Sequence, residues 1–380
     1  MDKHNFDDEA IQKHAMLHGK IETNPKVKVL TEEDLSIYYT PGVGAVSKLL
    51  ANNPEKAKDY TIKSNTIAVI SDGSAVLGLG NVGPEAAMPV MEGKAMLFKS
   101  LAGVDAFPIC LDTQDTEEII LTIKNIAPVF AGINLEDIAS PKCFEIERRL
   151  QDELNIPVIH DDQHATAIVV LAGLINALKV VDKPAATSRV VILGVGAAGV
   201  GVAILLVEYG FEDIIVVDSK GIISSARTDL NSEKQALAKL VNKRDVQGDL
   251  KDALENSDVF IGLSSGGHLP PELIESMNPK SIIFALANPE PEILPSQALE
   301  AGAMVVASGR SDFPNQINNV LVFPGLFKGL IQNEIIEVSS KIKVQAAKAL
   351  ASVVENPTPE KIIPSVFDPA VVEAIAKSIT

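Results

Sequence analysis

Two adjacent carboxylates stand where the sequence predicts that a strand ends and a helix begins. Asp161 and Asp162 follow the apolar run 156–159, which predicts a short buried strand. They precede the Ala- and Leu-rich stretch 165–178, which predicts a buried helix. In open α/β sheets, ligands bind beyond the carboxyl ends of the strands. The two side chains are therefore candidates for a site at that edge.

A second pair of carboxylates follows an earlier apolar segment. Glu136 and Asp137 come after residues 128–134, which are expected to form a strand. If the two strands are neighbours, these carboxylates meet and repel one another unless a cation neutralises them. Oxygen ligands of this kind suit Mg²⁺ or Mn²⁺. The structural alternative is that Asp161 caps its helix while Glu136 and Asp137 lie in a solvated loop.

A lysine and a tyrosine have unusual surroundings. Lys94 lies in the expected helix 85–100 among Gly, Ala, Met and Phe residues, which is uncommon for a solvated position. A desolvated lysine has a lowered pKa and can act as a base, but a surface lysine that extends into water would fit the same sequence. Tyr39 follows another tyrosine and precedes a Pro-Gly turn, and its simplest interpretation is one of two buried tyrosines.

The second half of the chain carries the pattern of a dinucleotide site. Residues 189–193 predict a strand, and Gly194, Gly196 and Gly199 follow it before an apolar helix. The next expected strand ends in Asp218. Glycines at this spacing allow a tight turn and close approach of a pyrophosphate to the helix N-terminus. The terminal acid accepts hydrogen bonds from a ribose and repels a 2′-phosphate, so the pattern predicts NAD, with NADP possible because Lys220 is near.

Further candidates lie in loops. The segment 78–83 repeats the glycine spacing, but its context is less typical, so it is interpreted as a structural turn or a source of backbone N–H groups. Asn288 follows the expected strand 281–287, whose tip would face the cofactor, and Asn319 lies in an amide-rich segment. Neutral amides bind a carboxylate or carbonyl without adding charge, although a role in turn formation is equally compatible.

Length and pattern together predict two α/β domains. At 380 residues the chain exceeds the size of most single cores. Strands alternate with helices in both halves, which predicts parallel sheets covered by helices. We expect an N-terminal catalytic domain at residues 1–160. A Rossmann-type NAD-binding domain is expected at 161–380, with C-terminal helices that return to the first domain.

Charge and cysteine usage limit the partners and the compartment. A net charge of −17 argues against nucleic acid or an anionic membrane, since both require a basic surface. Cys110 and Cys143 form no disulfide framework or zinc spacing, which suits a reducing cytoplasm. The uncharged stretch 190–207 is long enough to consider as a membrane span, but its glycines favour a strand, turn and helix.

With these segments in place, the chain resembles the malic enzymes, in their short bacterial form, over nearly its whole length. The matching segments occur in the same order. They are Tyr39-Thr40-Pro41-Gly42-Val43, Gly78-Leu79-Gly80-Asn81-Val82-Gly83, Gly93-Lys94, Glu136-Asp137, His160-Asp161-Asp162-Gln163-His164, Ala287-Asn288-Pro289, and Asn318-Asn319-Val320 before Phe323-Pro324-Gly325.

The resemblance implies an activity and its cofactors. It implies oxidative decarboxylation of L-malate to pyruvate and CO₂, with NAD or NADP and with Mg²⁺ or Mn²⁺ held by Glu136, Asp137 and Asp162. It also suggests a homodimer or higher homo-oligomer. Two alternatives are an oxaloacetate decarboxylase on the same scaffold and a dinucleotide sensor without catalysis. The intact glycine motif and Asp218 argue against the first, and the acidic cluster argues against the second.

The same resemblance implies roles for single residues. Lys94 would be the base that takes the proton of the C2 hydroxyl, and Asp161 would pair with it. Tyr39 would be the acid that protonates the carbon of enolpyruvate. Asn288 and Asn319 would hold the substrate.

The chain departs from the family in two places. Longer members carry an arginine shortly before the first glycine motif, where this chain has Ser74-Ala75-Val76. Substrate carboxylate binding would then depend on backbone N–H groups and amides. Ala165 stands where a glycine is usual, at the start of a helix.

Overall fold

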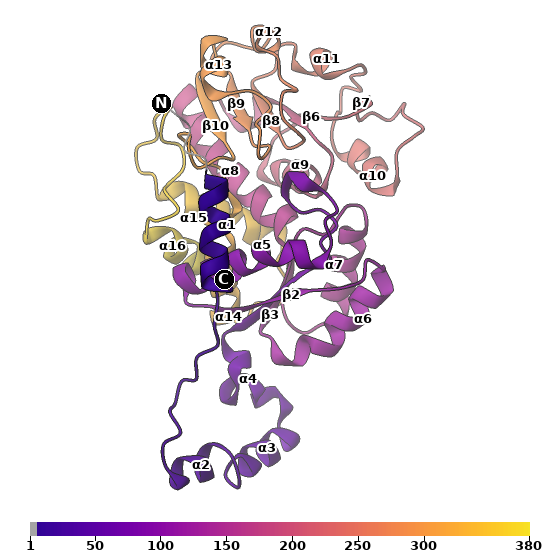
Figure 1. Ribbon diagram of the computed structural model, residues 1–380. Coiled ribbons are helices and arrows are strands. Elements are labelled where there is room, and N and C mark those ends of the chain that lie inside the picture. Colours follow the sequence, from indigo (N-terminus) through magenta and orange to yellow (C-terminus); the bar gives the residue numbers. More distant parts are fainter. Residues whose placement is uncertain (1–5) are drawn as a thin grey trace.

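The computed structural model describes residues 6–380, which form two mainly parallel sheets, their covering helices and a projecting arm (Figure 1). The first sheet has the strand order β2-β1-β3-β4, and all three pairings are parallel. Its strands are β1 (Thr66–Ser71), β2 (Asp105–Cys110), β3 (Gly132–Leu135) and β4 (Val158–His160). The connecting helices are α5 (Pro84–Leu97), α6 (Thr116–Ile126) and α7 (Lys142–Glu153).

The second sheet has the order β10-β9-β8-β5-β6-β7. The chain moves from β5 to β6 on one side and later to β8 on the other, so the strand order reverses at β5. Ligands bind at such a reversal in open α/β sheets. The strands are β5 (Arg189–Leu193), β6 (Asp213–Asp218), the antiparallel β7 (Gly221–Ile222), β8 (Val259–Gly262), β9 (Ile282–Ala285) and β10 (Val305–Ser308). Helices α9 (Ala197–Tyr209), α10 (Ser232–Leu240), α11 (Leu250–Leu254), α12 (Pro271–Ile274) and α13 (Pro295–Glu300) belong to this half.

One long helix, α8 (Asp161–Val181), joins the two halves. It packs against α9 and against α15 (Ser340–Ser352) near the C-terminus. Residues of both sheets, such as Ile67 and Ile192, belong to one continuous hydrophobic core around it. By length and composition α8 could cross a membrane, but 78% of its most apolar window is buried inside the structure. This apolar character therefore fits a core helix that fixes one sheet against the other.

The last helices contact the first half. Phe323 and Phe327 of α14 (Phe323–Gln332) pack on Phe98, with ring centroids 4.6 and 5.4 Å away. Phe98 begins the π-helical turn that follows α5. The final helix, α16 (Ala370–Ser378), packs on α14. The C-terminal segment therefore closes over the end of α5, which carries Lys94.

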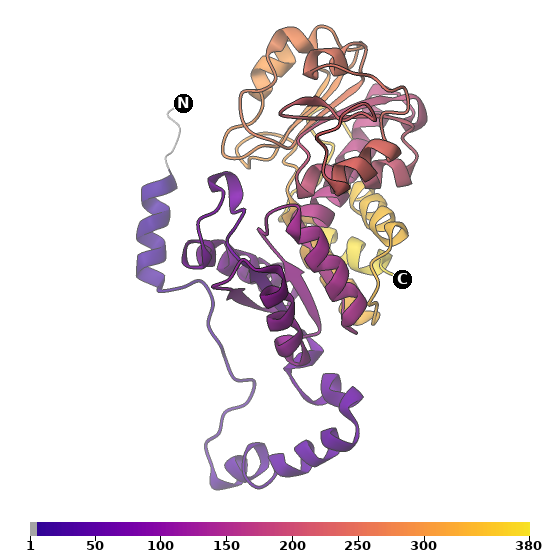
Figure 2. The same ribbon diagram turned by 90° about the vertical axis from the view of Figure 1, so that its right-hand side faces the viewer.

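The N-terminal segment behaves differently. After α1 (Phe6–Leu17), the chain runs into an arm that contains α2 (Glu32–Tyr38), α3 (Val43–Asn52) and α4 (Ala57–Tyr60). Both views show this arm extending away from the body (Figures 1 and 2). None of these helices has a buried residue, although large apolar side chains such as Leu30, Ile37 and Tyr60 are exposed. Helices this short and exposed draw little stability from one another.

Most expected elements are present, with two differences at their ends. The strand expected at 128–134 begins only at Gly132, because Ala127–Val129 forms a 3₁₀ turn around Pro128. The helix expected from 165 already begins at Asp161. Near the C-terminus, α15 begins at Ser340, where the Ser339 side chain accepts a hydrogen bond from the backbone N–H of Ile342. The stretch 190–207 forms β5, a glycine turn and most of α9.

Candidate active site

The first feature of the site is a cluster of three carboxylates. Glu136, Asp137 and Asp162 each offer an oxygen, and these oxygens all lie within 4.8 Å of one another. The register of the sheet explains why these carboxylates are close. Leu135 of β3 pairs with His160 of β4, so the residues that follow the two strands lie at the same edge of the sheet. The two-strand neighbourhood expected from the sequence is therefore present.

Local hydrogen bonds hold this cluster in shape. Asn134 donates to Glu136 Oε2 at 2.8 Å, and the backbone N–H of Asp137 donates to Asp162 Oδ2 at 2.9 Å. His160 Nε2 lies 3.7 Å from the same oxygen of Asp162. Carboxylates this close and mostly buried need positive charge, and a set made only of oxygen donors suits a hard divalent ion. The residues present therefore fit the expected Mg²⁺ or Mn²⁺.

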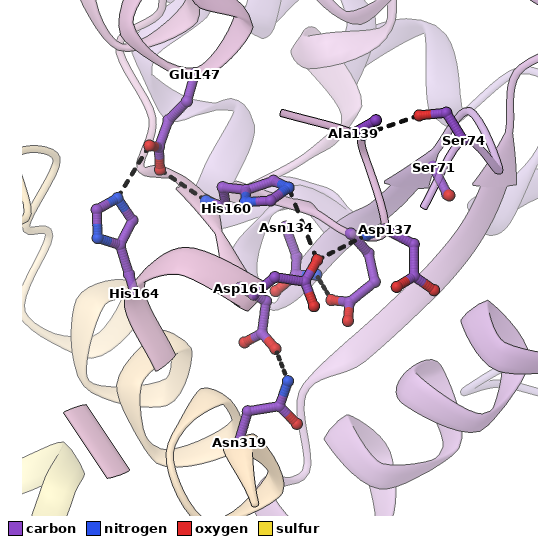
Figure 3. Close-up of polar contacts among 12 residues, drawn as sticks. Ser71, Ser74, Asn134, Asp137, Ala139, Glu147, His160, Asp161, His164 and Asn319 are labelled. Carbon is purple, nitrogen blue, oxygen red and sulfur yellow. Dashed lines mark hydrogen bonds and ion pairs between the residues drawn. The ribbon is translucent and has the colours of Figure 1, made fainter. Parts of the chain in front are cut away.

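Lys94 lies against this cluster. Its Nζ is 2.6 Å from Asp161 Oδ2 and 2.8 Å from Glu136 Oε1, and only 7% of the side chain is exposed. The ammonium also lies 4.2 Å from the centroid of the Phe323 ring. Asn319 donates to Asp161 Oδ2 at 2.6 Å, so this carboxylate joins two candidate catalytic residues (Figure 3). The expected pairing of Asp161 with Lys94 is present, and the surface-lysine alternative is excluded.

The expected lowering of the Lys94 pKa is wrong for the protein without a bound cation. Burial does lower this pKa, but the charges of Asp161 and Glu136 outweigh it and raise the pKa above the ordinary lysine value. Burial in turn raises the pKa of Glu136. The sequence context of Lys94 indicated the burial correctly. It could not indicate that two carboxylates from other segments would lie within contact of the ammonium.

Tyr39 is not brought to this centre within one chain. It follows α2 on the projecting arm and is 63% exposed, whereas α5 lies in the body (Figure 1). The interpretation of Tyr39 as one of two buried tyrosines is wrong as well, because Tyr38 is 52% exposed. A capping box formed by Thr31 and Asp34 begins α2, the helix that precedes Tyr39.

The glycine turn after β5 has the geometry that a dinucleotide needs. Gly194 has φ +113°, and a Cβ on Gly199 would lie 2.0 Å from the Gly194 carbonyl oxygen. Only glycine therefore permits this crossing of turn and helix. A Cβ on Gly196 would meet nothing within 4 Å, so the backbone faces open space at the N-terminus of α9. These residues fit a pyrophosphate bound at the helix N-terminus.

A cavity of about 840 Å³ extends from this turn to Asp218 at the end of β6. The Asp218 carboxylate is not available in the way the sequence suggested. Arg227 and Lys234 hold it in ion pairs of 2.7 and 2.6 Å. Burial acts against ionisation, but hydrogen bonds from these two cations lower the pKa of Asp218. Lys220 lies close to Asp218 in the sequence, but Arg227 and Lys234 follow Asp218 by 9 and 16 residues, and only folding places them here.

A smaller cavity of about 330 Å³ joins the two halves. Asp137 and Asp162 line one side, and Asn288, Asn319 and Ser264 line the other. Two of the three clustered carboxylates therefore share one space with the amides that were expected to hold substrate. Asn288 reaches this cavity from the loop that follows β9.

The first glycine motif helps to shape this cavity. A Cβ on Gly78 would lie 2.5 Å from the Asn288 carbonyl oxygen, so a larger residue would push the two halves apart. The backbone N–H groups of Val82 and Gly83 both donate to the Gly73 carbonyl. These contacts give the motif 78–83 a structural role, which is one of the two interpretations left open by the sequence.

One further residue of the site, Glu147 on α7, carries no motif that would mark it in the sequence. Its carboxylate is buried and accepts from the backbone N–H of His160 at 2.7 Å (Figure 3). It also contacts His164 Nε2 at 2.9 Å. Glu147 therefore anchors both sides of the short junction that carries Asp161 and Asp162. Nothing distinguishes it in the charged sequence of α7.

Comparison with known proteins agrees with this geometry. The family described as "Malic enzyme, N-terminal domain" matches residues 18–151, and "Malic enzyme, NAD binding domain" matches residues 163–379. The NAD-dependent malic enzyme of Geobacillus stearothermophilus is 56% identical, over 95% of this chain and 76% of its own length. The bifunctional malic/malolactic enzyme of Bacillus subtilis is 51% identical, over 98% and 92%.

A solved structure gives the same result. The crystal structure of the NAD-dependent malic enzyme from Thermotoga maritima superposes with a TM-score of 0.95 at 49% identity, over 97% of this chain and 98% of that one. Both domain matches, the sequence identities and the shared two-sheet fold support the same conclusion. This chain belongs to the malic enzyme family.

Proposed function

We propose that this chain catalyses the oxidative decarboxylation of L-malate to pyruvate and CO₂, with NAD as the hydride acceptor and Mg²⁺ or Mn²⁺ at the carboxylate cluster. One observation carries the proposal: Asp137 and Asp162 share a cavity with Asn288, at the edge that the glycine turn of the second sheet also approaches. The NAD-dependent relatives support the choice of cofactor.

The cation and the dinucleotide have defined places in this proposal. Glu136, Asp137 and Asp162 would hold the cation through their oxygens, and the turn at Gly196 would accommodate the pyrophosphate of NAD. When bound, a divalent cation polarises a coordinated oxygen and neutralises carboxylate charge, and NAD accepts hydride from carbon.

Lys94 would take the proton of the C2 hydroxyl. Asp161 holds its Nζ at 2.6 Å and is itself held by Asn319, so the amine has one fixed position. While the surrounding carboxylates are ionised, Lys94 retains its proton. A cation held by Glu136 would offset the carboxylate charge that raises the pKa of Lys94. It would therefore favour the neutral amine that a base requires.

The acid that protonates C3 of the enol would be Tyr39 of a second copy of the chain. We propose a homodimer in which the arm of residues 21–62 packs on the partner. Leu30, Ile37 and Tyr60 are each more than half exposed on this arm, and such a surface is typical of an interface. A cavity of about 400 Å³ beside Lys94 and Asn319 would receive the phenol.

Mixed dimers test this arrangement. Tyr39→Phe and Lys94→Met subunits are each expected to lack malate oxidation, because each site would lack its acid or its base. Refolded or co-expressed mixtures should recover activity, since one site of each mixed dimer then combines an intact Lys94 with an intact Tyr39. A mixture that stays inactive, with mixed dimers verified by mass, would contradict the assignment of Tyr39 to the partner's site.

The proposal also divides the chain at residue 160, with a catalytic domain at 1–160 and an NAD-binding domain at 161–380. Contacts of α14 with the turn after α5 support the return of the C-terminal helices to the first domain. Because both halves share the core around α8, they should unfold in one transition.

A single assay tests the activity. Purified protein with L-malate and NAD should produce NADH absorbance and equimolar pyruvate in Mn²⁺, and neither in excess EDTA. Pyruvate must be measured directly, because a relative is named a bifunctional malic/malolactic enzyme and lactate is the product that this name suggests. No NADH in the presence of Mn²⁺ would refute the proposal.

The alternative function is an oxaloacetate decarboxylase that uses the same cluster. It predicts loss of oxaloacetate without any nicotinamide and no NADH from malate. The open approach to Gly196 and the large cavity beside it favour the oxidoreductase, since a decarboxylase would have no use for them.

A further inference from the structure

A buried carboxylate joins the ends of two neighbouring strands of the second sheet. Glu292 lies in the loop after β9 and is only 1% exposed. Its Oε1 accepts a hydrogen bond from the backbone N–H of Ser264, and its Oε2 accepts one from the backbone N–H of Ala287, both at 3.1 Å. Ser264 follows β8 and Ala287 follows β9, so this one side chain links the two strand ends.

The linked strand ends border both cavities of the site. Ser264 lines the cavity of about 840 Å³ beside the glycine turn and also the cavity of about 330 Å³ that joins the two halves. Ala287 and the next residue, Asn288, line the smaller cavity. The peptide before Ser264 packs on the glycine turn, because a Cβ on Gly194 would lie 2.6 Å from the Leu263 carbonyl oxygen. The buried carboxylate therefore holds the segment at which the two cavities adjoin.

The surroundings of this carboxylate are unfavourable for stability. A Cβ on Gly262, at the end of β8, would lie 2.3 Å from Glu292 Cδ, so only glycine leaves room for the carboxylate. Burial raises the pKa of Glu292, and backbone N–H groups oppose this effect more than the nearest cation, His268, does. A buried charge without a closely paired cation destabilises a protein. Features that break this rule are expected at functional sites.

We propose that Glu292 is a positioning residue for hydride transfer, which fixes the segment where the nicotinamide end of the dinucleotide meets the substrate. The inference rests on the proposed use of NAD and L-malate. Glu292 lines neither cavity and acts through Ser264 and Asn288. Both of its oxygens accept a backbone N–H, so a side chain with a single acceptor oxygen cannot hold both strand ends.

Replacement by glutamine tests this role. Glu292→Gln keeps the shape of the side chain, but its NH₂ group would face a backbone N–H, so one strand end loses its acceptor. Glu290→Gln is the matched control, since it removes the same charge from an exposed side chain of the same loop. Circular dichroism and urea unfolding confirm that the variants are folded under the conditions of the assay.

Calorimetry gives a result without any turnover. ADP-ribose lacks the nicotinamide that NAD carries, so the two ligands separate the ends of the dinucleotide site. We expect Glu292→Gln to bind NAD at least about fivefold more weakly than the wild type, as for loss of one hydrogen bond, with the affinity for ADP-ribose changed less than about twofold. Glu290→Gln should bind both ligands like the wild type. An unchanged affinity for NAD, or an equal loss for NAD and ADP-ribose, would overturn the proposal.

Kinetics separate positioning from a purely structural role. With L-malate, NAD and Mn²⁺, kcat of Glu292→Gln should fall about 10- to 100-fold, the size of effect that a small misplacement of reactants produces. The Mn²⁺ concentration for half-maximal rate should stay the same, because the carboxylate cluster belongs to the first sheet. A folded variant with the kcat of the wild type would refute the proposal, and so would a fall in kcat that saturating Mn²⁺ restores.

A second variant disturbs the same contact without removing the charge. Gly262→Ala places a methyl group where the Glu292 carboxylate lies and should cause the same selective loss of NAD affinity. The affinity of the wild type in this variant would contradict the role of Glu292. If the wild type oxidises no malate but the binding results hold, the proposed activity fails and the role of Glu292 stands. If malate is oxidised and Glu292→Gln keeps its kcat, the role of Glu292 fails alone.

Discussion

Replacement of Lys94 by methionine should destabilise the protein and make its stability depend on a divalent cation. The Lys94 ammonium forms ion pairs of 2.6 and 2.8 Å with Asp161 and Glu136, and all three side chains are almost fully buried. Removing one partner of a buried ion pair costs about 3–5 kcal/mol, because the remaining charge is left without compensation. Methionine keeps most of the packing volume, so the loss reports the charge.

A divalent cation on the cluster should reverse most of this loss. In the variant, Mn²⁺ would neutralise carboxylates that nothing else compensates, whereas in the wild type it competes with the Lys94 ammonium. The gain in unfolding free energy on adding Mn²⁺ should therefore be larger in Lys94→Met than in the wild type. Malate oxidation should remain absent even when stability is restored, since the base is missing.

Urea unfolding followed by circular dichroism, in EDTA and in Mn²⁺, measures these differences. Lys99→Met is the control: Lys99 forms a 2.6 Å pair with Asp105 but is 62% exposed, and such surface pairs contribute about 0–1 kcal/mol. The reasoning is refuted if Lys94→Met loses less than about 1 kcal/mol in EDTA, the range of a surface pair. An equal gain from Mn²⁺ in variant and wild type would refute it as well.

Three other substitutions test separate parts of the structure. Asp162→Asn should abolish malate oxidation and the stabilisation by Mn²⁺ while calorimetry still detects NAD; Mn²⁺-dependent activity in this variant would remove Asp162 from the metal site. Asp218→Ala should release Arg227 and Lys234 and raise the kcat/KM ratio of NADP to NAD, whereas an unchanged ratio would mean that the network does not affect cofactor choice. Asp258→Asn should cost about 1–3 kcal/mol at pH 7, because Asp258 accepts from Lys183 and from the Arg189 backbone. Burial opposes ionisation, but these hydrogen bonds lower the pKa of Asp258, so its contribution is present above the ordinary value of 3.8 and is lost as the pH falls through the lowered folded value. Urea unfolding of both proteins between pH 7 and pH 3 should show the difference shrink, and a constant difference would contradict this assignment.

The sequence alone determined the features that depend on neighbouring residues. The alternation of strands and helices, the glycine turn at Gly194 to Gly199 and the capping box at Thr31 all follow from local backbone chemistry. The order of strand, turn and acid also placed Asp218 at the end of β6. The carboxylates that follow β3 and β4 were predicted as a cluster because parallel strands end at a shared edge.

Only the tertiary structure decided what those residues face. Lys94 and Asp218 each look like available groups in sequence, yet each is held by charges from other segments. Asp161 and Glu136 hold Lys94, and Arg227 and Lys234 hold Asp218. A pKa and a hydrogen-bonding capacity depend on every charge within a few ångströms, and those charges come from all parts of the chain. The position of Tyr39 on an exposed arm was equally beyond local patterns. The sequence thus indicated which residues carry the chemistry, and the packing of the two sheets around α8 decided which charges they meet.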